Sequence, residues 1–207
     1  PGHILFDTVT TTVSISGFGI ASELDQERQA VQMSRRLEGP LPYISPEQTG
    51  RMNRDVDYRS DYYSLGVLLF ELLTGELPFH ADTLLEWVYS HISRLPPAPH
   101  AINVNVPEAV SAIVLKLLSK EPEARYQSAD GIIYDLERCV ALLAADQPIE
   151  PFTLGEQDVV QTFLVPQHLY GREDELAQLQ TLFEDAVAGQ TALCLVHGYS
   201  GVGKSAL

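Results

Sequence analysis

The stretch from residue 61 to residue 73 constrains the fold most, because apolar side chains surround it on nearly every side if it is helical. Its apolar residues are Tyr62, Tyr63, Leu65, Val67, Leu68, Leu69, Phe70, Leu72 and Leu73. A helix that is apolar all round has to be buried among other elements. Ser60 or Asp61 is the expected N-cap, and Gly75 follows as a stop signal. The sequence therefore predicts a domain built around this helix.

The elements predicted around this helix are mostly helical as well. Apolar residues at i, i+3 and i+4 spacing predict three further helices, at 83–94, 107–119 and 128–144. Residues 4–20 are rich in Thr, Val and Ile, which predicts two short strands joined by a turn near residues 7–11. Residues 21–59 form a long polar segment with several breakers, and loops of that length are usually functional. The predicted fold class is α+β.

The pattern changes after residue 143. Residues 144–166 contain three prolines, a glycine and scattered acids, which is typical of an interdomain linker. A predicted helix at 172–187 and an apolar strand at 192–196 follow, in the order that opens an α/β domain. We therefore predict three parts, namely 1–143, 144–166 and 167–207, and we expect the chain to be an excerpt of a longer protein.

The charge of the chain argues against nucleic-acid and lipid partners. It carries 28 acidic and 13 basic residues, which gives a formal net charge of -15. Phosphate backbones and anionic lipid surfaces repel such a chain. No apolar run approaches the ~20 residues that a membrane-spanning helix needs, and no signal-peptide pattern opens the sequence. We expect a cytoplasmic protein with no membrane segment in this region.

Five short blocks follow one another in a fixed order. They are Gly17-Phe18-Gly19, Ser45-Pro46-Glu47, Asp61 to Gly66, Glu71 to Phe79, and Leu118 to Tyr126. In this order they resemble the DFG turn, the APE motif, the central helix, its exit and the turn before the last helix in the C-terminal lobe of a serine/threonine protein kinase. The resemblance covers residues 1–143 and implies a mainly helical lobe of that fold.

Three residues have structural roles in this family. The resemblance implies that Glu47 and Arg125 form a buried ion pair, which ties the activation segment to the turn before the last helix. It also implies that Asp61 accepts hydrogen bonds from backbone N–H groups of the catalytic loop. From the residues alone, the alternatives are two solvated charges and a simple N-cap at Asp61.

The positions that would carry phosphoryl transfer depart from the family pattern. In the family, an aspartate of the DFG turn and an asparagine of the catalytic loop hold Mg²⁺. Gly17 stands at the first position, and His3 stands at the second if Pro1 follows the catalytic-loop lysine. Pro40 stands where the family usually has a threonine hydroxyl. Because Mg²⁺ prefers oxygen ligands, the resemblance implies a lobe with no intact catalytic residues.

The stretch GYSGVGKS near the end of the sequence matches the phosphate-loop pattern G-x-x-x-x-G-K-[ST] without a mismatch. Backbone N–H groups around Gly198, Gly201 and Gly203 would cradle the phosphates of a nucleotide. Lys204 would reach the β and γ phosphates, and Ser205 would ligate Mg²⁺. The sequence therefore predicts ATP and Mg²⁺ as cofactors, at a site that is incomplete within these residues.

The residues before this loop, Tyr170 to Leu176, resemble the entry to AAA-type and related signal-transduction ATPases. That resemblance covers residues 167–207. A kinase-like lobe joined to such an ATPase is similar to large bacterial multidomain sensor kinases, and it implies other signalling domains of the same chain as partners.

We interpret the chain as a regulatory fragment in which an inactive kinase-like lobe regulates or docks a P-loop ATPase. Two alternatives stay open. One is an active ATP-dependent serine/threonine kinase with a substitute metal ligand. The other is an ATPase for which the kinase-like region is a purely structural platform. An intact β3 lysine and catalytic aspartate upstream would favour activity.

Overall fold

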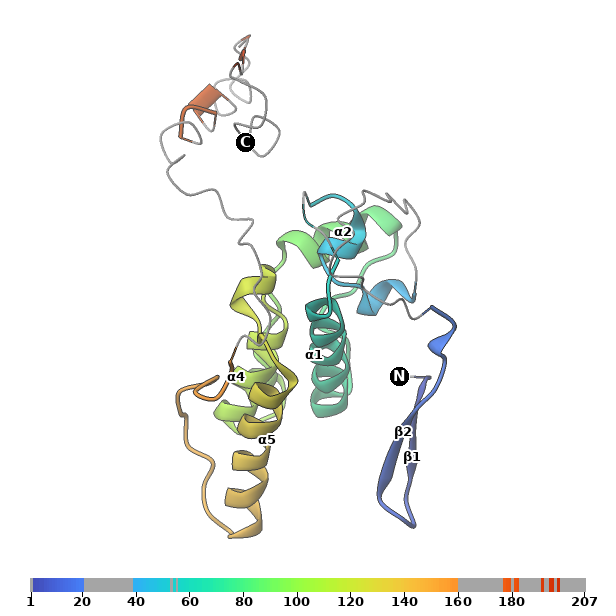
Figure 1. The fold of residues 1–207 in the computed structure, drawn as a ribbon, viewed down its shortest axis with the longest axis vertical. Coiled ribbons are helices and arrows are strands. Elements are labelled where there is room, and N and C mark those ends of the chain that lie inside the picture. The colour runs from blue at the N-terminus through green and yellow to red at the C-terminus, as the bar shows by residue number, and fades with distance from the viewer. Residues whose placement is uncertain are drawn as a thin grey trace. The chain divides into compact units, whose positions relative to one another are not determined.

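The structure is a computed structural model that describes residues 2–20, 39–52, 54, 56–159, 177–179, 181–182, 191, 194–195 and 197. The chain divides into two units, Pro1–Thr162 and Phe163–Leu207. The described part of the first unit contains helices and one small sheet (Figure 1), which agrees with the predicted mixture of both. The boundaries of the three parts predicted from the sequence stay a prediction.

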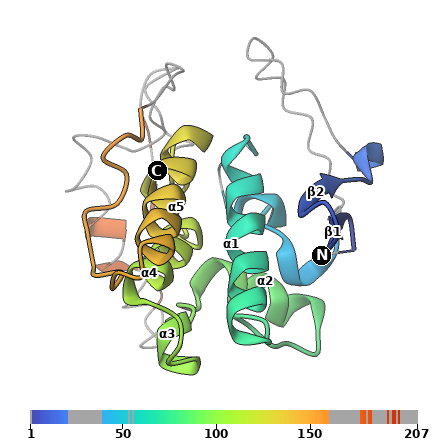
Figure 2. The same ribbon diagram turned by 90° about the horizontal axis from the view of Figure 1, so that it is seen from below.

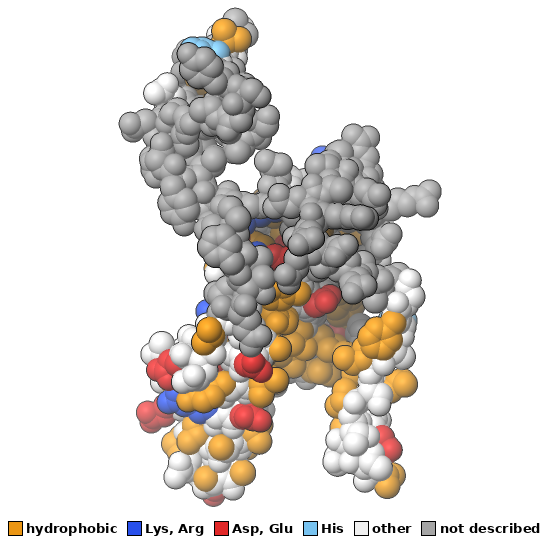
Figure 3. Space-filling model, in the orientation of Figure 1, with side chains coloured by type: hydrophobic (Ala, Val, Ile, Leu, Met, Phe, Trp, Pro, Cys, Tyr) orange, Lys and Arg blue, Asp and Glu red, His pale blue; other side chains and the backbone are white. Residues whose placement is uncertain are grey.

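Two antiparallel strands form a hairpin near the N-terminus. Strand β1 (Ile4–Asp7) pairs with β2 (Thr12–Ile15), with Ile4 opposite Ile15 and Asp7 opposite Thr12. The Asp7 carboxylate accepts a hydrogen bond from the backbone N–H of Val9 at 2.8 Å, which closes the turn. The predicted pair of strands is thus confirmed. Figure 3 shows apolar side chains at the surface of this hairpin, and the exposed large ones include Leu5, Phe6, Val9, Val13 and Ile15.

The other regular elements in the described part of the first unit are helical. They are α1 (Arg59–Thr74), α2 (Leu84–Ser93), α3 (Pro99–Ile102), α4 (Glu108–Leu117) and α5 (Ala129–Ala144). Short 3₁₀ turns lie at Phe18–Ile20, Leu41–Tyr43, Glu47–Thr49 and Pro122–Ala124. The four long helices confirm the sequence prediction within a few residues at their ends. The single turn of α3 and the 3₁₀ turns are too short to give a periodic pattern.

The core lies between α1, α4 and α5, which pack on one another in that order. Apolar residues of α1 and α4 form one buried cluster, made of Tyr63, Val67, Phe70, Val114 and Leu118. A second cluster joins α4 to α5 through Ile113, Leu117, Tyr126, Ile132 and Cys139. Leu72 of α1 is 71% exposed. The expectation that α1 is buried on every side is therefore wrong at its C-terminal end.

The start of α1 also differs from the expectation. The helix begins at Arg59 with Tyr58 at the N-cap position. The predicted cap at Ser60 or Asp61 is therefore wrong. The reason is that the Asp57 carboxylate, just upstream, already accepts a hydrogen bond from the backbone N–H of Arg59 at 2.8 Å.

Residues 149–158, called the strap below, pack against the lobe although the sequence pattern predicted a linker there. Ile149, Phe152 and Leu154 are packed against the cluster that joins α4 to α5. Figures 1 and 2 show the strap, in orange, running beside α5. Because the strap is apolar only at scattered positions, it has no helical or strand periodicity by which it could be predicted.

Much of the second unit lies outside the described residues. This holds for the predicted phosphate loop, 198–205, and for most of the predicted helix 172–187 and strand 192–196. No helix within the described ranges has the length and apolar character that crossing a bilayer requires.

Candidate functional site

The first part of the site is the short turn that carries Glu47. Pro46 is in the right-handed helical region and opens a 3₁₀ turn from Glu47 to Thr49. The side chain of Gln48 accepts hydrogen bonds from the backbone N–H and the hydroxyl of Ser45, at 2.8 and 3.1 Å. Gly50 ends the turn with φ +65°, a conformation that glycine adopts without strain. These local bonds fix the direction in which the Glu47 carboxylate points.

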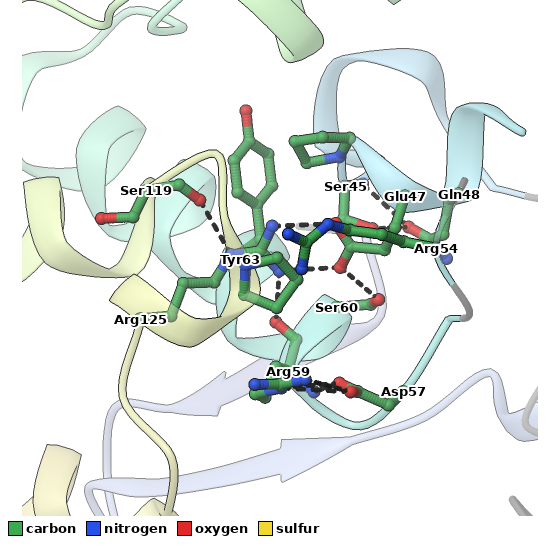
Figure 4. Close-up of polar contacts among 12 residues, drawn as sticks. Ser45, Glu47, Gln48, Arg54, Asp57, Arg59, Ser60, Tyr63, Ser119 and Arg125 are labelled. Carbon is green, nitrogen blue, oxygen red and sulfur yellow. Dashed lines mark hydrogen bonds and ion pairs between the residues drawn. The ribbon is translucent and has the colours of Figure 1, made fainter. Parts of the chain in front are cut away.

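Arg125 approaches Glu47 from a turn that lies far away in the sequence. Its Nη1 and Nη2 atoms donate to the two carboxylate oxygens of Glu47 at 2.7 and 2.8 Å (Figure 4). The remaining donors reach the carbonyl oxygens of Arg59, Ser119 and Lys120, at 2.9, 2.8 and 3.0 Å. All five guanidinium N–H groups therefore have an acceptor. The ion pair predicted from the sequence is confirmed.

The environment of this pair keeps the Glu47 carboxylate charged. Glu47 and Arg125 are 2% and 1% exposed. Burial alone would raise the pKa of Glu47, but the hydrogen bonds and charge of Arg125, together with the Ser60 hydroxyl at 2.6 Å, outweigh it and lower that pKa. The ring of Tyr63 lies 5.0 Å from the guanidinium carbon of Arg125, at cation–π distance.

The pair joins three parts of the lobe. Glu47 belongs to the segment that follows residue 39, Ser60 and Arg59 begin α1, and Arg125 follows the last 3₁₀ turn before α5. A more exposed ion pair lies beside it, between Arg54 and Glu123 at 2.6 Å. The buried pair thus fixes the segment that the resemblance identifies as the end of an activation segment, while the exposed pair is open to solvent screening.

A buried histidine, His91, also contacts the segment that follows residue 39. His91 of α2 is 0% exposed. Its Nε2 lies 2.9 Å from the carbonyl oxygen of Leu41, and its Nδ1 lies 3.0 Å from the hydroxyl of Tyr63. A carbonyl can only accept, so Nε2 carries the proton. Burial, the largest cause, lowers the pKa of His91 to about 4, and the nearby charge of Lys120 also lowers it, against the raising effect of the bond to Leu41.

This role of His91 was not predicted from the sequence. One signal was available, because Trp87 lies four residues earlier in a helical pattern and therefore on the same face. The Trp87 ring is stacked on the imidazole with ring centroids 5.9 Å apart. Other bonds fix the same segment, since the Tyr43 hydroxyl donates to Glu71 at 2.6 Å and the Ser64 hydroxyl donates to the Tyr43 carbonyl at 2.7 Å.

The two positions that the resemblance assigns to a metal lie side by side in the hairpin. The backbone N–H of Ser16 donates to the carbonyl of His3 at 2.8 Å, which brings the ends of the two strands together. Gly17 has φ +80°, and a Cβ built there would overlap the His3 ring. The pair therefore offers an imidazole and no carboxylate. Since Mg²⁺ prefers oxygen ligands, these residues do not fit the ion.

The other predicted site residues are also accounted for. Pro40 is exposed and has no hydroxyl to offer. Asp61 is exposed on α1, and its side chain has no hydrogen bond or ion pair with the part of the chain that the structure describes. Its predicted bonds to a catalytic loop stay a prediction. Gly198, Gly201, Gly203, Lys204 and Ser205 lie outside the described residues.

Comparisons with known proteins agree with the two resemblances. The family described as "Protein kinase domain" matches residues 1–133, and the family described as "AAA ATPase domain" matches residues 168–207. The chain is 41% identical to the hybrid signal transduction histidine kinase G of Dictyostelium discoideum, over 84% of this chain and 6% of that protein.

Two bacterial relatives match the kinase part. Serine/threonine-protein kinase PksC of Streptomyces coelicolor is 37% identical over 73% of this chain and 26% of its own length. Serine/threonine-protein kinase PknB of Mycobacterium tuberculosis is 38% identical over 67% of this chain and 22% of its own length. The chain thus spans about a quarter or less of these relatives. The match over residues 1–133 shows that the chain belongs to the protein kinase family, and an AAA ATPase segment follows its kinase part.

Proposed function

We propose that the chain is a regulatory part of a cytoplasmic signalling protein of the bacterial multidomain sensor-kinase type. Its kinase lobe transfers little or no phosphate itself, and it regulates or docks the ATPase segment that follows. Nucleotide binds at the phosphate loop of that segment, at Gly198, Gly201, Gly203, Lys204 and Ser205. Further signalling domains of the same protein are its partners.

The observation that carries this proposal is the hairpin end at Gly17 and His3. An aspartate at position 17 would need room for a Cβ that the His3 ring now fills. An imidazole is a poor ligand for Mg²⁺. A charge pair at ~4 Å with an effective dielectric constant of 20 is worth ~4 kcal/mol. The loss of one metal-binding carboxylate therefore costs about three orders of magnitude in rate.

The intact ion pair supports a role that needs the shape of the lobe. Glu47 and Arg125 keep every hydrogen bond that their charges require. A lobe that has lost its metal ligands but keeps this internal bracing can still present a surface to a neighbouring domain. We infer that docking, and not phosphoryl transfer, is the use of this fold here.

A phosphotransfer assay on the complete kinase domain of the full-length protein tests this proposal. The unmodified domain is expected to show little Mg²⁺-dependent autophosphorylation. The double variant Gly17→Asp with His3→Asn restores both oxygen ligands and removes the ring that blocks position 17, so it is expected to gain activity. Gly17→Asp alone is the matched control, and it is expected to gain less because the His3 ring stays in place.

An active serine/threonine kinase is the second candidate, and the names of the PksC and PknB relatives favour it. It predicts robust, metal-dependent autophosphorylation by the unmodified domain. That activity would disappear when an upstream catalytic aspartate is replaced. Such a result would replace our proposal.

A further inference from the structure

Asp158, at the end of the strap, binds the two residues that precede helix α5, of which Ser128 is the N-cap of the helix. Its Oδ1 accepts hydrogen bonds from the backbone N–H and the hydroxyl of Ser128, at 2.8 and 2.9 Å. Its two oxygens also accept from the backbone N–H of Gln127, at 3.0 and 2.8 Å. A Cβ on Gly131 would lie 2.6 Å from the Asp158 carboxylate, so only a glycine leaves it this room. A carboxylate here also faces the positive end of the helix dipole.

A second anchor lies three residues before Asp158. The backbone N–H of Gly155 donates to the Asp135 carboxylate at 2.8 Å, and the Tyr126 hydroxyl donates to the same oxygen at 2.6 Å. Asp135 and Tyr126 are both 0% exposed. The strap therefore supplies one of the hydrogen bonds that a buried carboxylate of the lobe needs.

Side-chain packing fixes the strap along its length. The guanidinium carbon of Arg138 lies 4.1 Å from the ring centroid of Phe152, and Arg138 also reaches Glu156 at 3.7 Å. Together with the apolar contacts of Ile149 and Leu154, these bonds make the strap a part of the lobe. The strap lies outside both family matches, which end at residue 133 and begin again at residue 168.

Among the described residues, Asp158 is the last anchor of the strap, and its position limits how far the ATPase segment can reach. With the strap docked, residues 159–167 connect Asp158 to the start of the ATPase match, and nine residues span at most about 30 Å. With the strap released, the connection runs from residue 145, and 23 residues span at most about 80 Å. We propose that the strap is a latch, which means that it docks on the lobe reversibly and that Asp158 holds it there. Its docking or release sets the length of the tether between the kinase lobe and the ATPase segment.

Hydrogen exchange and small-angle X-ray scattering on the 207-residue chain test the latch. In Asp158→Ala, the amides of Gln127, Ser128 and Gly155 are expected to exchange at least tenfold faster, and the maximum dimension of the chain is expected to increase. Asp158→Asn keeps one acceptor oxygen and loses the charge, so its effect should be intermediate. Neither measurement depends on kinase or ATPase activity. The latch proposal can therefore be contradicted while the proposed function stands, and the proposed function can be contradicted while the latch proposal stands.

Glu150→Gln is the matched control, since Glu150 is an exposed strap carboxylate without a hydrogen bond or ion pair to any other described residue. It is expected to leave exchange and dimensions unchanged. Unchanged exchange or unchanged dimensions in Asp158→Ala would overturn the latch. Faster exchange throughout α1 as well would also overturn it, because Asp158 would then hold the whole lobe together and not a releasable strap.

Discussion

Glu47 and Arg125 carry full charges although they are almost completely buried. The removal of such charges from water is expensive, and it is tolerated only when every donor and acceptor has a partner. Here two carboxylate contacts and three backbone carbonyls satisfy the guanidinium group. At the scale of single residues, this pair holds three segments in one arrangement. Its contribution to the stability of the lobe is lost when either member is removed.

Replacement of one member strands the other. We expect Glu47→Ala and Arg125→Ala each to lower the free energy of unfolding by about 3–5 kcal/mol, because an uncompensated charge stays buried. Glu121→Gln is the control, since Glu121 is 52% exposed and pairs with Arg54 at the surface. It should cost less than about 1 kcal/mol. Denaturant titration measures the free energy of unfolding of all three variants. Equal losses in the buried and the exposed pair would contradict the stabilising role of the Glu47–Arg125 pair.

His91 makes stability depend on pH. Its pKa is lowered from 6.5 to about 4 in the folded protein, chiefly by burial. Between these values the unfolded chain binds a proton at His91 and the folded chain does not. The contribution of His91 to the free energy of unfolding is therefore fully present above pH 6.5. It is lost as the pH decreases toward 4, by about 3 kcal/mol in total.

His91→Gln should remove most of this pH dependence, because glutamine can donate to the Leu41 carbonyl and does not titrate. The free energy of unfolding, measured from pH 7 to pH 5, checks this expectation. His80→Gln is the control at an exposed histidine and should leave the slope unchanged. An identical slope in His91→Gln and the unmodified chain would show that other groups set the pH dependence.

At the scale of elements, periodicity predicted the long helices well and the irregular segments poorly. The apolar spacing of Val110, Ile113 and Val114 was sufficient to place α4. The strap could not be predicted, since its contacts join residues that are distant in the sequence, as Asp158 shows by binding Gln127 and Ser128 about thirty positions away. The position of Glu47 and Arg125 came from a resemblance, because spacing alone does not show that two distant charges meet.

Gly66 shows how close the helices approach. A Cβ at this position of α1 would lie 2.8 Å from the Cβ of Leu117 on α4. Helix propensity favours Gly66→Ala by about 1 kcal/mol, but overpacking of a well-packed core costs about 1–3 kcal/mol. We expect the steric effect to dominate and the variant to be less stable.

Thermal or denaturant unfolding of Gly66→Ala measures the balance. Leu118→Ala removes the Cγ and Cδ2 atoms that would lie 3.2 Å from the new methyl group, so Gly66→Ala combined with Leu118→Ala should recover part of the loss relative to Leu118→Ala alone. A more stable Gly66→Ala would show that α1 and α4 can separate at this point without cost.

At the scale of the whole molecule, the net charge of -15 opposes the binding of a polyanion such as ATP. Under the proposed function, phosphate binding at residues 198–205 would then depend on local groups, namely backbone N–H groups and the side chain of Lys204, one of only three lysines in the chain. Removal of the positive charge of Lys204 should weaken ATP binding far more than removal of a positive charge elsewhere in the chain. The effect of the net charge on ATP binding and the effect of the charge at Lys204 can thus be tested separately.

We therefore expect Lys204→Ala in the full-length protein to weaken ATP binding at least tenfold, because it removes the one positive side chain of the phosphate loop. Arg94→Ala removes the same charge from an exposed position in the kinase lobe and should change the affinity by less than about twofold. Isothermal titration with ATP and Mg²⁺ measures both. If the two variants lose affinity equally, and the loss disappears at high salt, long-range charge and not Lys204 governs binding. If neither loses affinity, the nucleotide binds elsewhere in the protein.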